Sequence, residues 1–394
     1  LRNFWARRAR RILPMSILVT IATVIAGLFM LEPGKIRELS AVGLGALGFC
    51  ANIVLFFRTS DYLSGVTAPS PLRHFWSLAV EEQFYFVWPI AIIGFVGLRK
   101  RVFAHLFKVT VWVSGLVVVV ASCWFFLMCS RYGSRVNDEW WFRPLSERNI
   151  TPEHFAFYSP FTRAWEFVVG VLVALLLRLK FISHVLKAGS MFTFGGALLV
   201  WLGLSWATKF PEIQHEGNYG TNTSATLAVV IGTGFLIFGG LNDKLLSRLL
   251  SLKPLTLIGD YSYSIYLWHW PIYVTALIMF PEHKFVVVLF STPLTYALSL
   301  ITYKYVETKF NSSRISSKRF WVLTLATGQL ISASIFFVMY LGVSKGWSQD
   351  WALNTHKVMN RGCDAGDIDF KRCFWGDANS STSIYLVGDS MAWA

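Results

Sequence analysis

Residues 12–31 read ILPMSILVTIATVIAGLFML without a charged side chain, and they directly follow the basic run ARRARR at 6–11. A helix needs about twenty consecutive apolar residues to cross a bilayer, because lipid offers the backbone no other hydrogen-bond partner. Hydrophobic residues make up 54% of the chain, and its mean hydropathy is +0.50. A soluble domain is not expected from such a composition, so the sequence predicts a polytopic membrane protein.

Further apolar segments follow this first one along most of the chain. They lie at 38–57, 75–97, 106–129, 161–177, 189–207, 222–241, 255–279, 284–305 and 319–341. The connectors between them are either short and basic or mixed in charge, and the two kinds alternate from residue 98 onward. Because positive loops stay in the cytoplasm, the net charge of +14 reads as a topology signal, and we expect no nucleic-acid partner.

One of the first three apolar segments is expected not to cross. Basic residues place both 1–11 and 98–108 in the cytoplasm, so an even number of crossings must separate them. Segment 38–57 contains Gly43, Gly45 and Gly48, and we expect it to be re-entrant or broken, beside an internal cavity. The alternative is that 38–57 crosses and the loop at 98–108 departs from the rule. The predicted fold class is thus an all-α polytopic membrane protein, with about nine spans and one re-entrant segment.

The C-terminal residues 342–394 are polar and contain no further apolar segment. Since the last span is expected to exit outward, Cys363 and Cys373 would lie in an oxidising compartment, where their spacing suits a small disulfide loop. No His or second Cys pair stands at ligand spacing beside them, so no metal site is predicted. The remaining cysteines are expected to be core thiols, and they are Cys50, Cys123 and Cys129.

The sequence is expected to be a piece of a longer protein. It begins at Leu1, and it ends soon after a strand-like run at 383–387 and the turn Gly388-Asp389-Ser390, whereas a domain cannot stop after one strand. We predict a membrane domain at 1–341, an outer linker at 342–382 and the start of an outer domain at 383–394. Ser390 in its tight turn is typical of a nucleophile position, but no His follows to serve as its base.

Four guanidinium groups stand within five residues before the first span, at Arg7, Arg8, Arg10 and Arg11. Helical spacing makes neighbours of residues three and four apart, and arginine suits bidentate binding of phosphate. A phosphate-bearing donor from the cytoplasm would meet this cluster first. The alternative is a topology anchor that touches anionic lipid headgroups.

Two adjacent carboxylates, Glu81 and Glu82, lie inside the apolar segment 75–97. Ionisable groups at such depth are costly and usually face a cavity, a partner or a substrate path. Adjacent helical residues point about a hundred degrees apart, so we expect only one of the two to face a given site. The alternative is that both lie at the interface and pair with Arg73.

Two further places carry polar groups in apolar surroundings. Arg163 and Glu166, three residues apart at the start of a span, are expected to pair and mainly to fix their helix. His269 lies within segment 255–279, where it could relay protons or hold a polar substrate. Pro271 is expected to kink this helix. The alternative for His269 is a structural hydrogen bond across helices.

Together these strings closely resemble the membrane-bound acyltransferase-3 family, in the subgroup with a C-terminal SGNH domain, an α/β fold. The resemblance covers residues 1–394 in family order. The matching strings are F-x-x-R-R-x-x-R-I-x-P at 4–14, HFWSLAVEEQFY at 74–85, TRAWEF at 162–167, YSYSIYLWHWP at 261–271, V-E at 306–307 and LVGDS at 386–390.

The resemblance implies a bacterial inner-membrane enzyme that O-acylates, most often O-acetylates, a cell-envelope glycan such as lipopolysaccharide O-antigen. The donor would be cytoplasmic acyl-CoA, with no bound cofactor, and the C-terminal domain would be extracytoplasmic. The family's R-x-x-R motif falls on Arg8 and Arg11, and its S-L-x-x-E glutamate on Glu81. His269 and Tyr266 match its aromatic-histidine string, Glu307 its V-E pair, and Ser390 with Asp389 its SGNH turn.

The departures from the family pattern concern both ends of the chain. The family's R-x10-H motif would precede Leu1, Met391 stands where the SGNH turn often has His, and Lys309 replaces a proline after Glu307. We therefore expect residues 1–394 alone to be inactive. A rival hypothesis is a transporter or flippase for a lipid-linked sugar or acyl carrier, with Glu81 and His269 as a proton relay.

Overall fold

The computed structural model describes most of the membrane domain, and every element in the described part is helical. The described residues are 2–31, 33–58, 70–99, 104–137, 139–147, 150–178, 189–209, 223–240, 243–311 and 318–344. The helices are α1 (Arg2–Met30), α2 (Pro33–Leu47), α3 (Ala51–Arg58), α4 (Phe75–Arg99), α5 (Ala104–Arg131), α6 (Gly133–Asn137), α7 (Arg143–Ser146), α8 (Pro152–Tyr158), α9 (Pro160–Leu176), α11 (Gly189–Lys209), α12 (Thr223–Gly240), α13 (Lys244–Leu250), α14 (Lys253–Met279), α15 (Lys284–Thr302), the π-helical segment η4 (Tyr303–Glu307), α16 (Thr308–Asn311) and α17 (Lys318–Ser344).

The protein is a multi-pass membrane protein. Within the described ranges, six helical stretches are long and apolar enough to cross a bilayer, and they are Phe4–Met30, Val111–Arg131, Pro152–Leu176, Gly189–Trp206, Thr223–Gly240 and Lys284–Phe310. Helices α4 and α14 also have the necessary length, at 25 and 27 residues. The helices follow the predicted apolar segments within a few residues, although α1 begins ten residues before 12–31 because the arginine run is itself helical. The count of about nine spans and the cytoplasmic side stay predictions.

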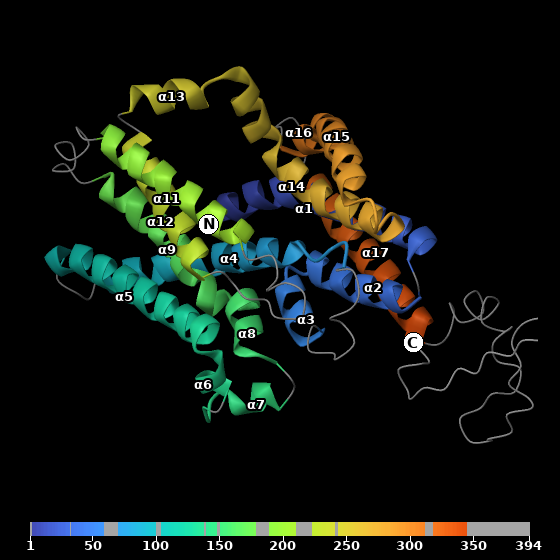
Figure 1. The fold of residues 1–394 in the computed structure, drawn as a ribbon, viewed down its shortest axis with the longest axis horizontal. Coiled ribbons are helices and arrows are strands. Elements are labelled where there is room, and N and C mark those ends of the chain that lie inside the picture. Colours follow the sequence, from blue (N-terminus) through green and yellow to red (C-terminus); the bar gives the residue numbers. More distant parts are fainter. Residues whose placement is uncertain are drawn as a thin grey trace, which may run out of the picture.

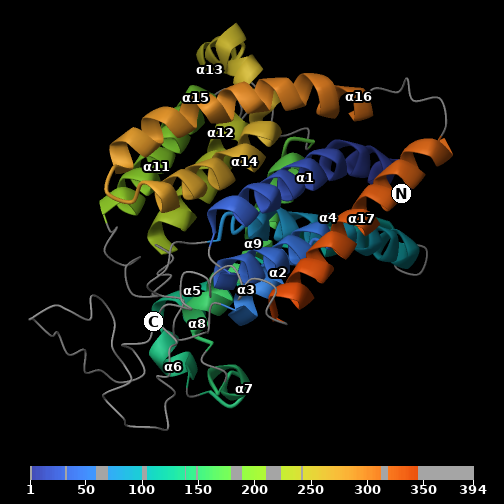
Figure 2. The same ribbon diagram turned by 90° about the vertical axis from the view of Figure 1, so that its right-hand side faces the viewer.

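The helices form two groups with α4 between them. Figure 1 shows α5, α9, α11 and α12 on one side of α4, and α1, α2, α14, α15 and α17 on the other. In Figure 2, α14 lies along α1, α15 lies along α14, and α17 runs past α2; the two helices of each of these pairs are in contact. Side chains from both ends of the chain therefore meet around α1 and α4.

The predicted break in segment 38–57 is confirmed. Helix α2 ends at Leu47 and α3 begins at Ala51, and between them Phe49 has a φ of 51°. The carbonyl of Phe49 accepts a hydrogen bond of 2.9 Å from Gln83 Nε2, and that of Leu47 accepts one from Gln329 Nε2. Irregular backbone is thus covered by protein, as a membrane requires. At 15 and 8 residues, neither helix is as long as the bilayer is thick.

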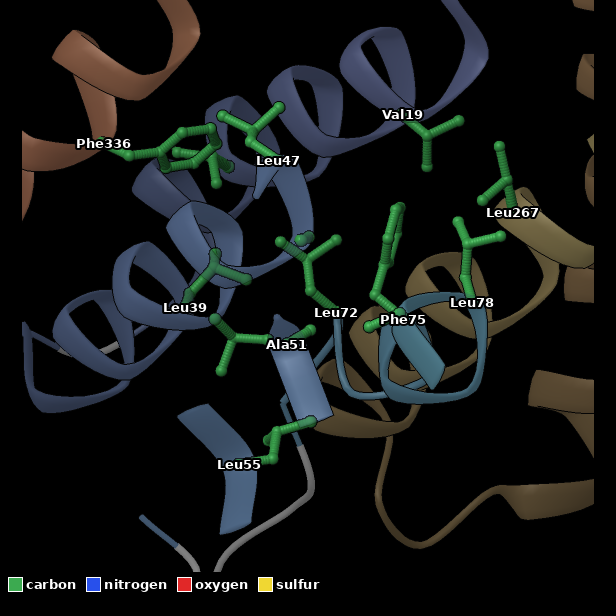
Figure 3. Close-up of a cluster of buried hydrophobic side chains, with 14 of the residues drawn as sticks. Val19, Leu39, Leu47, Ala51, Leu55, Leu72, Phe75, Leu78, Leu267 and Phe336 are labelled. Atoms are coloured by element: carbon green, nitrogen blue, oxygen red, sulfur yellow. The ribbon is translucent and has the colours of Figure 1, made fainter. Parts of the chain in front are cut away.

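The main apolar core joins α1, α2, α4, α14 and α17. Figure 3 shows Val19, Phe75 and Leu267 packed together, with Leu78 beside them, and each is at most 4% exposed. This core fixes the start of α4 against the middle of α1 and α14. The three predicted core thiols are all free cysteines; Cys129 is buried, whereas Cys50 and Cys123 are only partly buried.

Candidate functional site

Arg8 of α1 lies between both carboxylates of α4. Its Nη2 is 2.7 Å from Glu81 Oε1, and its Nε is 2.7 Å from Glu82 Oε1. The expectation that only one glutamate would face a given site is wrong, because the guanidinium spans the angle between adjacent helical positions with two of its donors. The alternative pairing with Arg73 is also wrong, since Arg8 fills that role and Arg73 Nε donates to the Tyr158 hydroxyl at 3.2 Å.

The two carboxylates differ in exposure. The side chain of Glu81 is 41% exposed, that of Glu82 15%, and that of Arg8 21%. Two carboxylates beside one guanidinium carry a net negative charge. Phosphate bound directly to Arg8 would have to use the Nη hydrogens that Glu81 and Glu82 do not occupy, next to the negative charge of both carboxylates. Glu81 is the carboxylate that an incoming molecule reaches first.

A cavity of about 420 Å³ opens beside this ion pair. Arg8 and Glu82 contribute to its wall, but most of the lining is apolar or aromatic, from Trp5, Ala9, Leu13, Phe49, Tyr85 and Phe86. The guanidinium of Arg8 lies 3.2 Å from the centre of the Tyr85 ring, and Trp5 stacks on Phe86. The helix break predicted to accompany an internal cavity contributes Gly48 and Phe49 to this wall.

The other arginines of the cluster point elsewhere. Arg7 and Arg11 are exposed, and Arg10 Nε donates to the carbonyl of Ala6 at 3.2 Å. Arg11 lies within electrostatic range of Glu307. The R-x-x-R pair is therefore divided, with Arg8 held by α4 and Arg11 facing η4 from the surface.

Glu307 ends the π-helical segment η4 and is 5% exposed. Its Oε2 accepts a hydrogen bond of 2.8 Å from the Ser264 hydroxyl of α14. Lys309, which replaces a family proline, lies in α16, so the backbone continues as helix where the pattern would turn. π-helical turns of this kind are frequent at functional sites.

The aromatic-histidine string forms the middle of α14. Tyr263 donates to the carbonyl of Ile12 at 2.8 Å, which ties α14 to α1. The Tyr266 hydroxyl lies 2.5 Å from Ser77 Oγ of α4, and His269 Nδ1 lies 2.5 Å from the Tyr266 carbonyl. His269 thus bonds within its own helix, and the described residues do not show the hydrogen bond across helices that was the alternative for this residue. We call the contact region of these three helices the α1/α4/α14 seam.

Sequence reasoning missed His74 as a site residue. It precedes α4 and is 8% exposed, and its ring centre lies 5.6 Å from that of His269 and 5.4 Å from that of Tyr266. Its place at the first position of the matching string HFWSLAVEEQFY was the available signal. A lone histidine at the edge of an apolar segment gave no other indication of a functional role.

The predicted pair of Arg163 and Glu166 is confirmed, at 3.0 Å between Nε and Oε1. Both side chains are under 20% exposed, and the guanidinium lies 5.4 Å from the Trp76 ring. This pair joins the start of α9 to α4, in keeping with its predicted structural role. Residues 342–344 of the predicted linker belong to α17. The rest of the linker and the start of the outer domain lie outside the described residues, and with them Cys363, Cys373, Asp389 and Ser390.

The fold and this seam define a class: a polytopic membrane protein that holds an arginine, carboxylates and histidines among apolar helices. Comparison with known families is more specific. The model of the acyltransferase domain of the acyltransferase-3 family matches residues 1–304. The chain therefore belongs to this family, as its motifs indicated. Membership favours an acyl-transferring enzyme over the rival transporter.

Several curated relatives bear names that state an activity. The chain is 28% identical to YrhL of Bacillus subtilis, named as a peptidoglycan O-acetyltransferase, over 69% of the chain and 39% of the relative. It is 24% identical to the peptidoglycan O-acetyltransferase OatA of Listeria monocytogenes, over 78% of the chain and 46% of the relative. It is 25% identical to the O-acetyltransferase OatA of Staphylococcus aureus, over 78% of the chain and 47% of the relative.

The chain spans less than half the length of these relatives. No solved structure matches the chain significantly.

Proposed function

We propose that this chain is the membrane part of an enzyme that transfers an acyl group, acetyl first of all, to a hydroxyl of a cell-envelope glycan. The donor is acyl-CoA, taken from the cytoplasmic side of a bacterial inner membrane. The observation that carries the proposal is the ion pair of Arg8 with Glu81 and Glu82 on the wall of an apolar cavity. Family membership supplies the reaction class.

The arrangement suits a donor with a charged head and a less polar arm. The exposed guanidinium groups of Arg7 and Arg11 offer bidentate donors to the phosphates of CoA. The cavity beside Arg8 is lined mainly by apolar side chains and would hold the arm and the acyl group. A transferred acyl group would then move along the seam to the acceptor side. Ser390 of the outer domain either receives it or shapes the acceptor site.

The names of the relatives support a choice of acceptor to test. Their names state peptidoglycan for two of the three proteins. We therefore propose peptidoglycan as the first acceptor to test and lipopolysaccharide O-antigen, the expectation from the sequence, as the second.

The deciding experiment is mass spectrometry of envelope glycans from cells with and without the intact gene. We expect one glycan to lose an acyl substituent in the deletion strain and to regain it when the gene is restored. For acetyl, the substituent adds about 42 mass units at a hydroxyl. Identical substitution of peptidoglycan and O-antigen in both strains would contradict the proposal. A second measurement supplies purified intact protein with isotopically labelled acetyl-CoA and follows label into glycan.

A further inference from the structure

We infer that the kink of α14 forms a two-histidine site, in which His269 receives the proton of the acceptor hydroxyl and His74 positions His269. The inference rests on the proposed function and adds a residue, His74, to it. The site is separate from the ion pair of Arg8. It is built from the turn before α4 and from the α14 residues around Pro271.

The tautomer of His269 follows from its hydrogen bond. Nδ1 lies 2.5 Å from the Tyr266 carbonyl, which can only accept, so Nδ1 carries the hydrogen. In a neutral ring, Nε2 then holds the free lone pair and is the basic nitrogen. His269 is half-buried, and the proposed acceptor hydroxyl meets the exposed part of this residue.

His74 lies behind His269 and closes the site on its buried side. It is 8% exposed, and neither ring nitrogen makes a regular hydrogen bond to the described protein. The backbone of Leu267 and of Pro71 faces the ring at longer range. Pro271 has no N–H, so the carbonyl of Leu267 lacks its usual helical donor. The two rings meet edge to face, with centres 5.6 Å apart and planes at 72°.

The turn that carries His74 is fixed to α14. Trp270 Nε1 donates to the carbonyl of Ser70 at 3.1 Å, and the Tyr266 hydroxyl donates to the carbonyl of His74 at 2.5 Å. Figure 3 shows Phe75 and Leu267 packed beside this turn. Two imidazole rings held this firmly in an apolar core are costly if they serve packing alone. We infer instead that the rigid attachment of this turn to α14 keeps the ring of His269 in one orientation, so that Nε2 points toward the substrate.

The two-histidine site lies next to the first residue of α4, the helix that also carries Glu81 and Glu82. Seven positions separate His74 from Glu81, which is about 10 Å along a helix. Ser77 and its bond to Tyr266 lie between them. A donor whose head is held near the arginines would extend its arm along the seam toward His269.

The acceptor oxygen attacks the thioester carbonyl, so a C–O bond forms and the C–S bond breaks. The hydroxyl proton goes to Nε2 of His269, and the departing thiolate takes a proton from water on the donor side. The imidazolium of His269 returns its proton to water on the acceptor side. His74 forms no bond to the substrate and acts through the orientation of His269.

A double-mutant cycle in the intact protein tests this assignment. We expect His269→Ala to lower kcat about 100-fold, the usual scale for a lost general base. We expect His74→Phe, which keeps the ring shape, to lower kcat about tenfold with the KM for acetyl-CoA unchanged. In the His269→Ala background, His74→Phe should cause no further loss, because its effect passes through His269. His74→Gln, which keeps a polar side chain facing the backbone of Leu267 and Pro71, should recover part of kcat.

The matched control is His154→Phe, which alters another buried histidine, in α8, and should leave kcat unchanged. Equal losses from His74→Phe with and without His269 would overturn the positioning role, as would wild-type kcat in His74→Phe. If His74→Phe lowers the melting temperature, the His74→Gln variant tests the positioning role instead. A folded His74→Gln variant with a kcat as low as that of His74→Phe would also contradict the inference. Absence of transfer by the wild-type protein would instead refute the proposed function.

Discussion

The α11/α12 pair and the α1/α4/α14 seam are both built from long apolar helices, yet they pack by different means. Helix α12 contains no charged residue, and α11 contains only Lys209 at its end. Their backbones approach so closely that a Cβ on Gly196 would lie 2.7 Å from the carbonyl oxygen of Gly232. In the seam, by contrast, α1 and α4 meet through Arg8 and two carboxylates.

This difference indicates that the α11/α12 pair gives structural support, whereas the α1/α4/α14 seam carries the chemistry. Small residues let membrane helices pack by van der Waals contact alone, and no buried charge is needed. A charged group in the same surroundings costs free energy, so it marks a place where a substrate or proton is handled. We therefore expect variants of the pair to affect stability and variants of the seam to affect transfer.

The largest effect is expected from Arg8→Ala. It leaves two adjacent, partly buried carboxylates without a counter-charge, which should lower the free energy of unfolding by about 3 kcal/mol and abolish transfer. Denaturant unfolding in detergent and an acyl-transfer assay measure both. Arg7→Ala, at an exposed neighbouring position, controls for the loss of one positive charge and should unfold like the wild type. A wild-type unfolding curve for Arg8→Ala would show that the ion pair does not hold the seam.

Gly196→Ala should destabilise the packing of the α11/α12 pair. The new methyl group would force α11 and α12 apart, at a cost of about 2 kcal/mol. Gly195→Ala is the matched control on the same helix, because its Cβ would meet nothing within 4 Å. It should be neutral or slightly stabilising. Thermal unfolding distinguishes the two, and equal melting temperatures would count against close backbone packing. KM for acetyl-CoA should change in neither variant.

Glu81→Gln and Glu82→Gln sharpen the account of the seam itself. Glu81 is the more exposed carboxylate and the family's S-L-x-x-E glutamate, so its amide variant should lower kcat/KM about tenfold. Glu82→Gln keeps an acceptor for Arg8 and removes a charge that is costly to bury, so it should stay within about twofold of wild type. Steady-state kinetics of both variants decide the matter, and the reverse order would discredit the assignment of Glu81.

The smallest effect concerns Asp243, which caps α13 and bonds to α11 outside the spans. Hydrogen bonds from the Thr193 hydroxyl and from the backbone of Leu246 and Leu245 lower the pKa of Asp243. A lowered pKa in the folded state adds stability above the unfolded pKa, and this stability is lost as the pH falls through the folded value. The protection factors of the Leu245 and Leu246 amides, which correct for the intrinsic pH dependence of hydrogen exchange, should therefore fall in acid. Asp243→Ala should have low protection factors at every pH, and a variant whose protection factors still fell in acid would exclude Asp243 as the cause.

Much of this organisation could be predicted from the sequence. Apolar length sets the helices, and the clustered glycines Gly43, Gly45 and Gly48 indicated the break at 48–50, although the residue in the left-handed region is Phe49 and not a glycine. Long-range pairing could not be predicted. Nothing in the local sequence joins Arg8 to Glu81 and Glu82, and the expectation from helical geometry failed because one guanidinium reaches both. His74 was missed for the same reason, since its partner His269 is distant in the chain.

The central claim is that the arginines at the start of α1 receive the acyl donor. Arg8 is a poor probe because it also pairs with the carboxylates of Glu81 and Glu82 on α4. Arg11 is exposed and lies outside that ion pair. The most direct test is the KM for acetyl-CoA of the intact protein with Arg11→Ala, compared with Arg248→Ala on α13. The account predicts a rise of about tenfold for Arg11→Ala, as expected for a lost charge-assisted phosphate contact, and no change for Arg248→Ala. Equal KM values in both variants and the wild type would contradict it.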